Sequence, residues 1–390
     1  MLASPTFRSS FKEKERDVLN LFTVEGEGGY LPLEYSFMFK GSAFFTSEIA
    51  NSVANVVKDD SRIKSFVIPG TSTTVKYMDN VLRVVLGNHN QCILYRDGKV
   101  DIGNNTYDFP YMRTIMYEIK DTFCPSSYSE GGAQYQQMLL LNNGDLVFIN
   151  PYNKTNVTAL TGVQKFLSKN QAHRSDAIVG CENGDVYHVW VGPTPRPDND
   201  GNGTPSGVIK INGIKHTDLL FCTIGDPPAC CTYALKSDPQ NIYRFIKGVG
   251  VANFKISGIS NSPLVGSGLE NMRLTGDEYY VDGMSQEFNS LYLTNKRMIH
   301  RSSYISYTRS TWNYGWEKEL FPVTPTISDP TIPAKKIVTP TAYTMIIEDI
   351  FGKYWLCTNN SDNYVLNKPI SYTFFDQLKS YLLPIREAAK

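Results

Sequence analysis

The residues best suited to chemistry lie in one acidic, glycine-rich stretch, from Asp198 to Ser206. Asp198, Asp200 and Asn202 place side-chain oxygen atoms at alternating positions, and a glycine follows at the sixth position. This is the spacing with which a calcium loop folds around its ion. The glutamate that closes such a loop is absent, because Ile209 stands at the twelfth position. Two interpretations stay open, a calcium site and a solvated acidic turn.

No other stretch of the sequence forms a catalytic constellation. The five histidines are scattered, and no two stand at the i, i+4 spacing that binds a metal on one helical face. Gly248 to Asn253 contains only a fragment of a dinucleotide loop, and Val265 to Gly268 falls short of the serine elbow of hydrolases. We therefore expect a protein that is not an enzyme and that binds no cofactor, calcium apart.

A short hairpin pattern recurs along the chain and organises it. An apolar run is followed by a turn, most clearly Asn-Gly or Asp-Gly, and then by a second run of alternating apolar residues. Two such runs around such a turn predict a β-hairpin. The turns lie at Gly41, Gly98, Gly144, Gly184, Asn241, Arg297 and Gly352, the fifth being a loosened turn over Lys236 to Asn241.

The spacing of these turns predicts the architecture. They recur every 40 to 57 residues, within the range of blade-type repeats. A single antiparallel sheet cannot cover both of its faces, so such units stack radially into a closed ring. The sequence therefore predicts an all-β fold, a seven-bladed β-propeller, with an unrelated sandwich or barrel array as the alternative.

The second unit also resembles the repeat of RCC1-like β-propellers. The two units that follow it keep only the part around their Asn-Gly turns, and the Gly-Gln-Leu-Gly element of the family is absent. The resemblance implies RCC1-like blades, but the nucleotide-exchange activity of the family's founding member is not carried over, because none of its functional residues is matched. The matching residues are Gly87, His89, Leu94, Asp97, Gly98, Val100, Gly103 and Asn105.

Each end of the chain predicts a short helix. Ser10 to Glu13 has the capping-box pattern, so a helix is expected from about Phe11 to Phe22. Near the other end, Ser371 can cap a helix that continues to Pro384. Its apolar stripe consists of Phe374, Phe375, Leu378, Tyr381 and Leu382.

These elements divide the chain into a helical arm at residues 1–30, the propeller at 31–367 and a C-terminal helix at 368–390. Within the propeller, residues 322–340 carry five prolines and are interpreted as a linker or extended excursion. A helical turn is expected within residues 161–169. Because a closed ring leaves no free sheet edge, strand material near residues 31–39 should pair with the final unit around residues 344–358.

Composition limits the partners. The net charge is zero and charged residues make up 19% of the chain, so we expect no nucleic-acid partner. The seven cysteines are irregularly spaced, and the first ten residues lack the charged start and apolar core of a signal peptide. We therefore expect reduced cysteines, manufacture in a cytoplasm, and no membrane span.

The expected function is a structural or protein-interaction role. Low charge and abundant tyrosine suit protein interfaces, and we expect contacts with other proteins of an assembly through the blade loops and the terminal helices. Manufacture in a cytoplasm without disulfides would suit a virion component, such as a phage tail, baseplate or fibre protein. Two alternatives remain open: a propeller that binds or cleaves glycans, and an RCC1-like regulator of a small GTPase.

Overall fold

The structure of this chain is a computed structural model, and it describes the strands together with the tight connections between them. The described residues are 20–23, 35–39, 42–45, 60–67, 72, 74–86, 91–103, 112–114, 119–123, 137–150, 155–168, 176–190, 207–223, 232–247, 256–259, 273–286, 289–304, 316–317, 333–340, 344–351, 354–360 and 363–369.

These residues form seven antiparallel sheets, which we number in chain order. The first sheet has the strand order β1 (Asn20–Thr23), β2 (Tyr35–Phe39), β3 (Ser42–Phe45), β5 (Thr74–Asp79) and β4 (Lys64–Val67). The second contains β6 (Val81–Leu86), β7 (Gln91–Tyr95), β8 (Val100–Gly103) and β9 (Met112–Thr114), and the third contains β10 (Ile119–Phe123), β11 (Gln137–Leu141), β12 (Leu146–Asn150) and β13 (Thr155–Leu160).

The remaining sheets repeat the four-stranded plan of the second and third. The fourth contains β14 (Val163–Phe166), β15 (Asp176–Cys181), β16 (Val186–Trp190) and β17 (Gly207–Ile211), and the fifth contains β18 (Leu219–Thr223), β19 (Thr232–Leu235), β20 (Asp238–Lys247) and β21 (Ile256–Ile259). The sixth contains β22 (Tyr280–Gln286), β23 (Asn289–Thr294), β24 (Ile299–Tyr304) and β25 (Trp316–Glu317), and the seventh contains β26 (Ala334–Pro340), β27 (Thr344–Asp349), β28 (Tyr354–Asn360) and β29 (Asn363–Pro369).

The all-β fold class is thereby confirmed. Within the described residues the only helical element is the short 3₁₀ helix η1 (Asp60–Arg62), which precedes β4. In each of the last six sheets the strands follow one another in chain order, so every neighbour in a sheet is also a neighbour in sequence. Such meanders arise because short turns join antiparallel strands directly.

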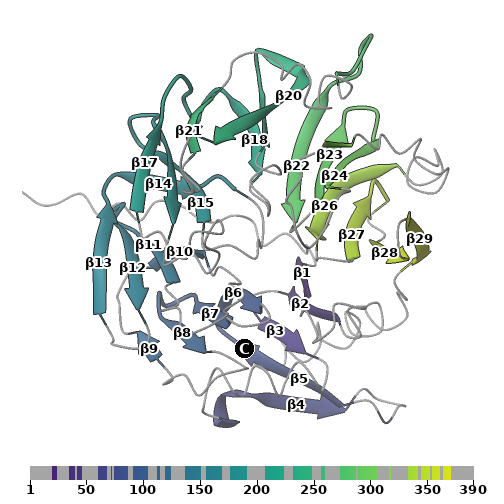
Figure 1. The fold of residues 1–390 in the computed structure, drawn as a ribbon. Coiled ribbons are helices and arrows are strands. Elements are labelled where there is room, and N and C mark those ends of the chain that lie inside the picture. Colours follow the sequence, from purple (N-terminus) through teal and green to yellow (C-terminus); the bar gives the residue numbers. More distant parts are fainter. Residues whose placement is uncertain are drawn as a thin grey trace, which may run out of the picture.

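The sheets follow one another around a ring (Figure 1). First strands contact first strands, since β10 lies against β14, β18 against β22, and β22 against β26. The ring is closed because β1 contacts both β6 of the second sheet and β26 of the seventh. This is the architecture of a β-propeller.

The core lies in the seams between sheets. One cluster joins the second and third sheets through Leu94 and Leu139, and others fill the next three seams. Between the fifth and sixth sheets, Phe221 packs on Tyr292, with ring centroids 6.0 Å apart. The third, fourth and fifth sheets therefore bury both faces against their neighbours, as the repeat argument requires.

Closure of the ring differs from the expectation. Strand β2 pairs with β1 and β3 rather than with the seventh sheet, whose order is β26-β27-β28-β29. The N-terminal strands complete a sheet of their own, and the ring closes by packing of β1 beside β26. The pairing predicted for residues 31–39 with residues 344–358 is therefore wrong for the described part of that stretch.

Four local expectations are also corrected. The helix predicted to end at Phe22 meets strand β1, whose pairing with β2 overrides the local helical pattern. The helical turn predicted within residues 161–169 is strand β14, and the proline-rich stretch 322–340 contains strand β26. The loosened turn before Asn241 is a tight two-residue connection, because Leu235 and Asp238 are paired. Residues 1–19 and 370–390, with the rest of both predicted helices, lie outside the described residues.

Candidate interaction faces of the ring

The ring has two unlike faces, which follow from the directions of its strands. On the first, which we call the turn face, the second strand of each sheet turns into the third and the last strand passes to the next sheet. On the opposite face, which we call the loop face, first strands connect to second strands and third strands to fourth strands in the last six sheets. Long connections leave both faces: residues 104–111, 124–136, 191–206 and 305–315 on the loop face, and residues 260–279 and 318–333 on the turn face.

The turns of the turn face share one backbone conformation. Gly98, Gly144 and Gly184 have φ angles of 79°, 87° and 86°, and Arg297 has 65° at the same position of the sixth sheet. In each turn, the backbone N–H of the left-handed residue donates to the carbonyl of the residue three positions earlier, as from Gly184 N to Cys181 O at 2.9 Å. A three-residue loop of this kind ends in the left-handed region, which glycine enters without a Cβ clash.

Backbone hydrogen bonds tie these turns to the following sheet. The carbonyl of the left-handed residue accepts the bond, because its orientation turns the oxygen towards the next unit. Val163 N donates to Gly144 O at 2.8 Å, His216 N donates to Gly184 O at 2.8 Å, and Ala334 N donates to Arg297 O at 3.2 Å. The turn face is thus held together by main-chain contacts between sheets, which depend on conformation rather than on side-chain identity.

A second repeated device is a β-bulge at the start of the first strand of six sheets. Each bulge skips one residue, as between Val163 and Lys165 opposite β15. Bulges of this type increase the local twist and redirect side chains. The skipped residues are Leu82, Lys120, Gln164, Leu220, Val281 and Lys335. No residue type is shared among all of them, which is why sequence reasoning missed the bulges.

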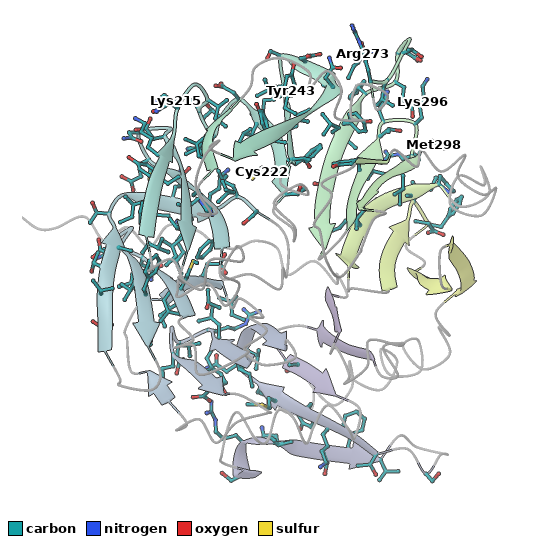
Figure 2. All side chains as sticks on the ribbon, viewed as in Figure 1. Lys215, Cys222, Tyr243, Arg273, Lys296 and Met298 are labelled. Atoms are coloured by element: carbon teal, nitrogen blue, oxygen red, sulfur yellow. The ribbon has the colours of Figure 1, made fainter. Side chains whose placement is uncertain are left out.

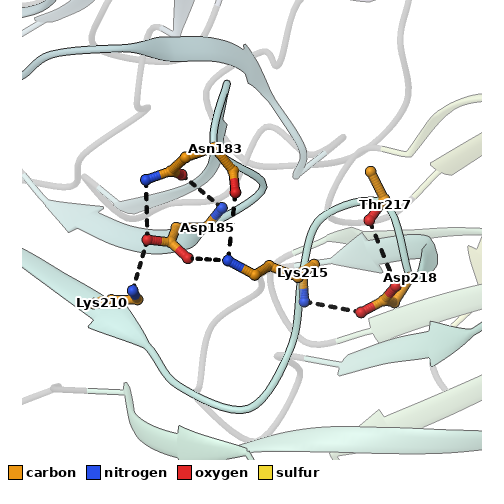
Figure 3. A network of polar contacts seen from close by, with 6 residues as sticks. All are labelled: Asn183, Asp185, Lys210, Lys215, Thr217 and Asp218. Carbon is orange, nitrogen blue, oxygen red and sulfur yellow. Dashed lines mark hydrogen bonds and ion pairs between the residues drawn. The ribbon is translucent and has the colours of Figure 1, made fainter.

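A polar network spans the fourth sheet and the connection to the fifth (Figure 3). The Asp185 carboxylate accepts hydrogen bonds from Lys210 Nζ and Lys215 Nζ, each at 2.6 Å, and from Asn183 Nδ2 at 3.2 Å. The bonds from Lys210 and then Lys215 lower the pKa of Asp185 to about 2. The bond to Asp185 raises the pKa of Lys210. Because the Asp185 carboxylate is paired with both lysines, the network stabilises the turn at Gly184 rather than leaving a free charge for a ligand.

The same network reaches the next sheet through the connection after β17. Lys215 N donates to Asp218 Oδ2 at 3.1 Å, and Thr217 Oγ1 lies 3.5 Å from Asp218 Oδ1. Figure 2 shows Arg273 at the outside of the ring, whereas Cys222 lies among the strands. The spacing of Asp185, Lys210 and Lys215 in sequence offers no signal for this contact, because the pairing of β16 with β17 brings Lys210 to Asp185 and the connection after β17 brings Lys215.

A buried ion pair joins the first and second sheets. Arg62 Nη1 lies 2.8 Å from Oδ2 of Asp101, whose side chain is fully buried. Tyr95 OH donates to the same oxygen at 2.7 Å, and the Arg62 guanidinium lies 4.2 Å from the Tyr95 ring centroid. Breaking such a pair from one side is costly, because the remaining charge stays buried. This cluster therefore holds η1 against the second sheet.

Hydroxyl groups bridge the seam between the fifth and sixth sheets. The Oγ1 atoms of Thr223 and Thr232 are 2.9 Å apart, and Thr232 Oγ1 is 2.9 Å from Tyr292 OH. All three residues are fully buried. Burial also raises the pKa of Tyr280 in the same seam, and burial together with Asp238 raises the pKa of Tyr243 to about 12. These tyrosines are neutral packing residues at neutral pH.

The structure does not place the residues of the predicted calcium loop. Asp198, Asp200 and Asn202 lie in the loop-face connection between β16 and β17, outside the described residues, as do Gly41 and Gly352. In the part of the chain that is described, no group of three or more His, Cys, Asp or Glu residues could hold a metal ion. That part also contains no helix with the length and apolar character to cross a membrane.

Comparison with known proteins gives similarity in structure only. No protein-family model matches the chain, and no curated protein matches it. Human WBSCR16 is similar at a TM-score of 0.43 and 10% identity, over 72% of this chain and 76% of that chain. Yeast RCC1 (Prp20), in its complex with Kap60, is similar at a TM-score of 0.37 and 7% identity, over 87% and 73%. The β-propeller domain of Myceliophteria thermophila Cps50 (Swd1) is similar at a TM-score of 0.38 and 9% identity, over 75% and 88%. These scores carry no argument, so the β-propeller assignment rests on the sheets and contacts of this chain.

Proposed function

We propose that this chain is a seven-bladed RCC1-like propeller that binds other proteins of an assembly through its loop face, without catalysis of its own. The observation that carries the proposal is the amino-acid composition of the connections that begin and end at strand ends on that face. They contain many aromatic residues, namely Tyr107, Phe109, Tyr111, Tyr128, Tyr135, Tyr307, Trp312 and Tyr314.

Aromatic side chains in loops are well suited to binding. Tyrosine and tryptophan bury a large area with few rotatable bonds, and they dominate the energetics of interfaces. Serine, glycine and asparagine stand between them, with serine and glycine running along residues 124–136 and asparagine at positions 104 and 105. The same mixture makes up antibody binding loops, where small polar residues adapt their hydrogen bonds to the partner. Sheets packed on both faces supply the rigid support that such loops need.

The partners fall into the class of other assembly proteins, and a phage tail, baseplate or fibre remains the setting that we favour. A glycan is the second candidate, favoured by the grouping of Tyr307, Trp312 and Tyr314, since aromatic rings stack on apolar faces of ligands. A regulator of a small GTPase remains a further candidate from the family resemblance alone.

Photo-crosslinking from opposite faces tests the proposal. A benzophenone amino acid replaces Tyr135 or Tyr307 in the connections of the loop face, and Asn142, exposed in the turn of the third sheet on the turn face, serves as the control. The proposal expects one discrete protein adduct from the loop-face positions and none from Asn142, in the cells or particles that contain the protein. Equal adducts from both faces would overturn it. Glycan-array binding abolished by Trp312→Ala, without any protein adduct, would favour the second candidate.

A further inference from the structure

Exposed apolar side chains gather on the turn face of the sixth and seventh sheets. Phe351 is 70% exposed, Ile350 is 47% exposed and Tyr279 is 42% exposed. Of the six exposed large apolar residues among those described, these three and Leu82 lie on the turn face, and the other two lie on the outermost strands β4 and β13. The adjacent pair Ile350 and Phe351 is the most exposed apolar site of this face, and exposed apolar patches mark binding surfaces.

Backbone bonds link the connections that carry the three residues. Asn295 N donates to Tyr279 O at 2.9 Å, which places Tyr279 beside the turn that ends at Arg297. The Arg297 carbonyl in turn accepts from Ala334 N, and Ile350 N donates to Pro333 O at 3.0 Å. A short chain of contacts thus leads from Tyr279 to Ile350 and Phe351. We call Tyr279, Ile350 and Phe351 the apolar patch.

The end of the last strand directs the C-terminal segment to this patch. Strand β29 is the fourth of its sheet and runs towards the turn face, where Pro369 is paired with Trp355. Phe351 precedes Trp355 by four residues, a path of about 13 Å along an extended chain. Phe374 follows Pro369 by five residues and can span up to about 17 Å. A segment of this length after Pro369 is therefore long enough to reach Phe351.

The sequence of that segment complements the patch. Residues 371–382 carry the apolar stripe at i, i+1, i+4, i+7 and i+8, which falls on one side of a helix about 18 Å long. A helix of this length is marginal in water on its own, so it forms only when its apolar side is packed against another surface. The apolar patch offers such a surface at the place where the segment begins.

We propose that residues 371–382 dock on the turn face as a helix, with the apolar stripe against Tyr279, Ile350 and Phe351. The chain then covers its own turn face over the sixth and seventh sheets. An outside partner reaches this area only by displacing the segment. The proposal does not depend on the function assigned to the loop face, and its test uses different positions.

Photo-crosslinking in the purified full-length chain tests the docking. A benzophenone amino acid at position 351 should form an intrachain adduct with the peptide containing residues 371–382, with a yield that is independent of protein concentration. Val157 is the matched control, because it is 56% exposed but lies on β13 of the third sheet. Adducts from position 351 to a second copy, to another part of the chain, or to nothing would overturn the proposal.

A charge placed in the stripe gives a second readout. Leu378→Asp should release the segment and increase the binding of a hydrophobic dye at least twofold, and adding Phe351→Ser should reverse most of that increase. Ser380→Asp is the control, because it adds the same charge on the opposite side of the helix. Equal dye binding by the Leu378→Asp and Ser380→Asp variants would contradict the docking.

Discussion

Replacing Gly283 by alanine tests how tightly the fifth and sixth sheets pack. Gly283 lies on β22, and a Cβ atom there would stand 2.4 Å from Cε2 and 2.6 Å from Cδ2 of Phe221 on β18. Ordinary contact begins at 3.4 Å, so the ring would have to move by about 1 Å. Phe221 is only 4% exposed and belongs to a cluster that includes Tyr280 and Tyr292, which limits that movement.

Over-packing of this kind destabilises a core by about 1–3 kcal/mol. We expect Gly283→Ala to lower the free energy of unfolding in urea by that amount, at unchanged strand content in the far-ultraviolet circular dichroism spectrum. The cost should come from the clash with Phe221, so a smaller residue at 221 should relieve it. In a Phe221→Leu background, Gly283→Ala should therefore cost less than half of its cost in the wild-type chain.

A double-mutant cycle decides the matter, because residues in contact show coupling energies of about 0.5–3 kcal/mol. Gly162→Ala is the control: Gly162 has a φ of 68°, and a Cβ atom added there would meet no atom within 4 Å, so its strain is independent of Phe221. If Gly283→Ala costs the same in both backgrounds, or costs nothing, the two sheets do not pack as described, and the seam between β18 and β22 is incorrect.

Three further outcomes are expected. Gly144→Ala should lower the free energy of unfolding by about 1–2 kcal/mol, because alanine is strained in the left-handed conformation. Arg297→Gly at the equivalent turn should be close to neutral, because the relieved strain offsets the added entropy of the unfolded chain. Urea unfolding of both variants measures the contrast, and equal losses of stability would contradict the shared turn conformation. The lowered pKa of Asp185 implies stability that is present above about pH 4 and lost as the pH falls towards about 2. Asp185→Asn should therefore flatten the decline of the urea midpoint over that pH range, with Asp145→Asn, at the same position of the third sheet, as the control. An unchanged decline in the Asp185→Asn variant would be evidence against the Lys210 and Lys215 contacts. Calorimetry should detect heat on adding millimolar calcium, abolished by Asp200→Asn, if residues 198–206 form a calcium loop; absence of heat would leave the solvated acidic turn.

The turns were predictable because their chemistry is local. An Asn-Gly or Asp-Gly pair favours the left-handed conformation at its second residue, and Gly98, Gly144 and Gly184 adopt it. Arg297 adopts the same conformation without being glycine, so at that position spacing rather than residue type carried the prediction. The strand at Asn20–Thr23 was not predicted, because the local spacing of apolar residues fits a helix and carries no information on the pairing of β1 with β2.

The bulges and the Asp185 network were beyond reach for a different reason. A bulge needs only an extra residue in one strand, and the skipped positions hold leucine, lysine, glutamine and valine alike. Asp185 and Lys210 come together because β16 pairs with β17, with Val186 opposite Ile211, and a one-residue shift would separate them. Sequence reasoning can therefore locate hairpin turns such as those at Gly98, Gly144 and Gly184, while the contacts between hairpins depend on register.

The unlike construction of the two faces has a consequence for how binding can evolve in this chain. On the turn face, main-chain bonds such as Val163 N to Gly144 O join one sheet to the next, so an insertion there would disturb the seam that follows. On the loop face, a connection such as residues 191–206 begins and ends at strands already paired over their full length. Loop length is tolerated cheaply, because doubling it costs only about 0.6 kcal/mol of closure entropy. Variation in binding residues should therefore concentrate in the long connections, while the tight turns between second and third strands keep their backbone geometry.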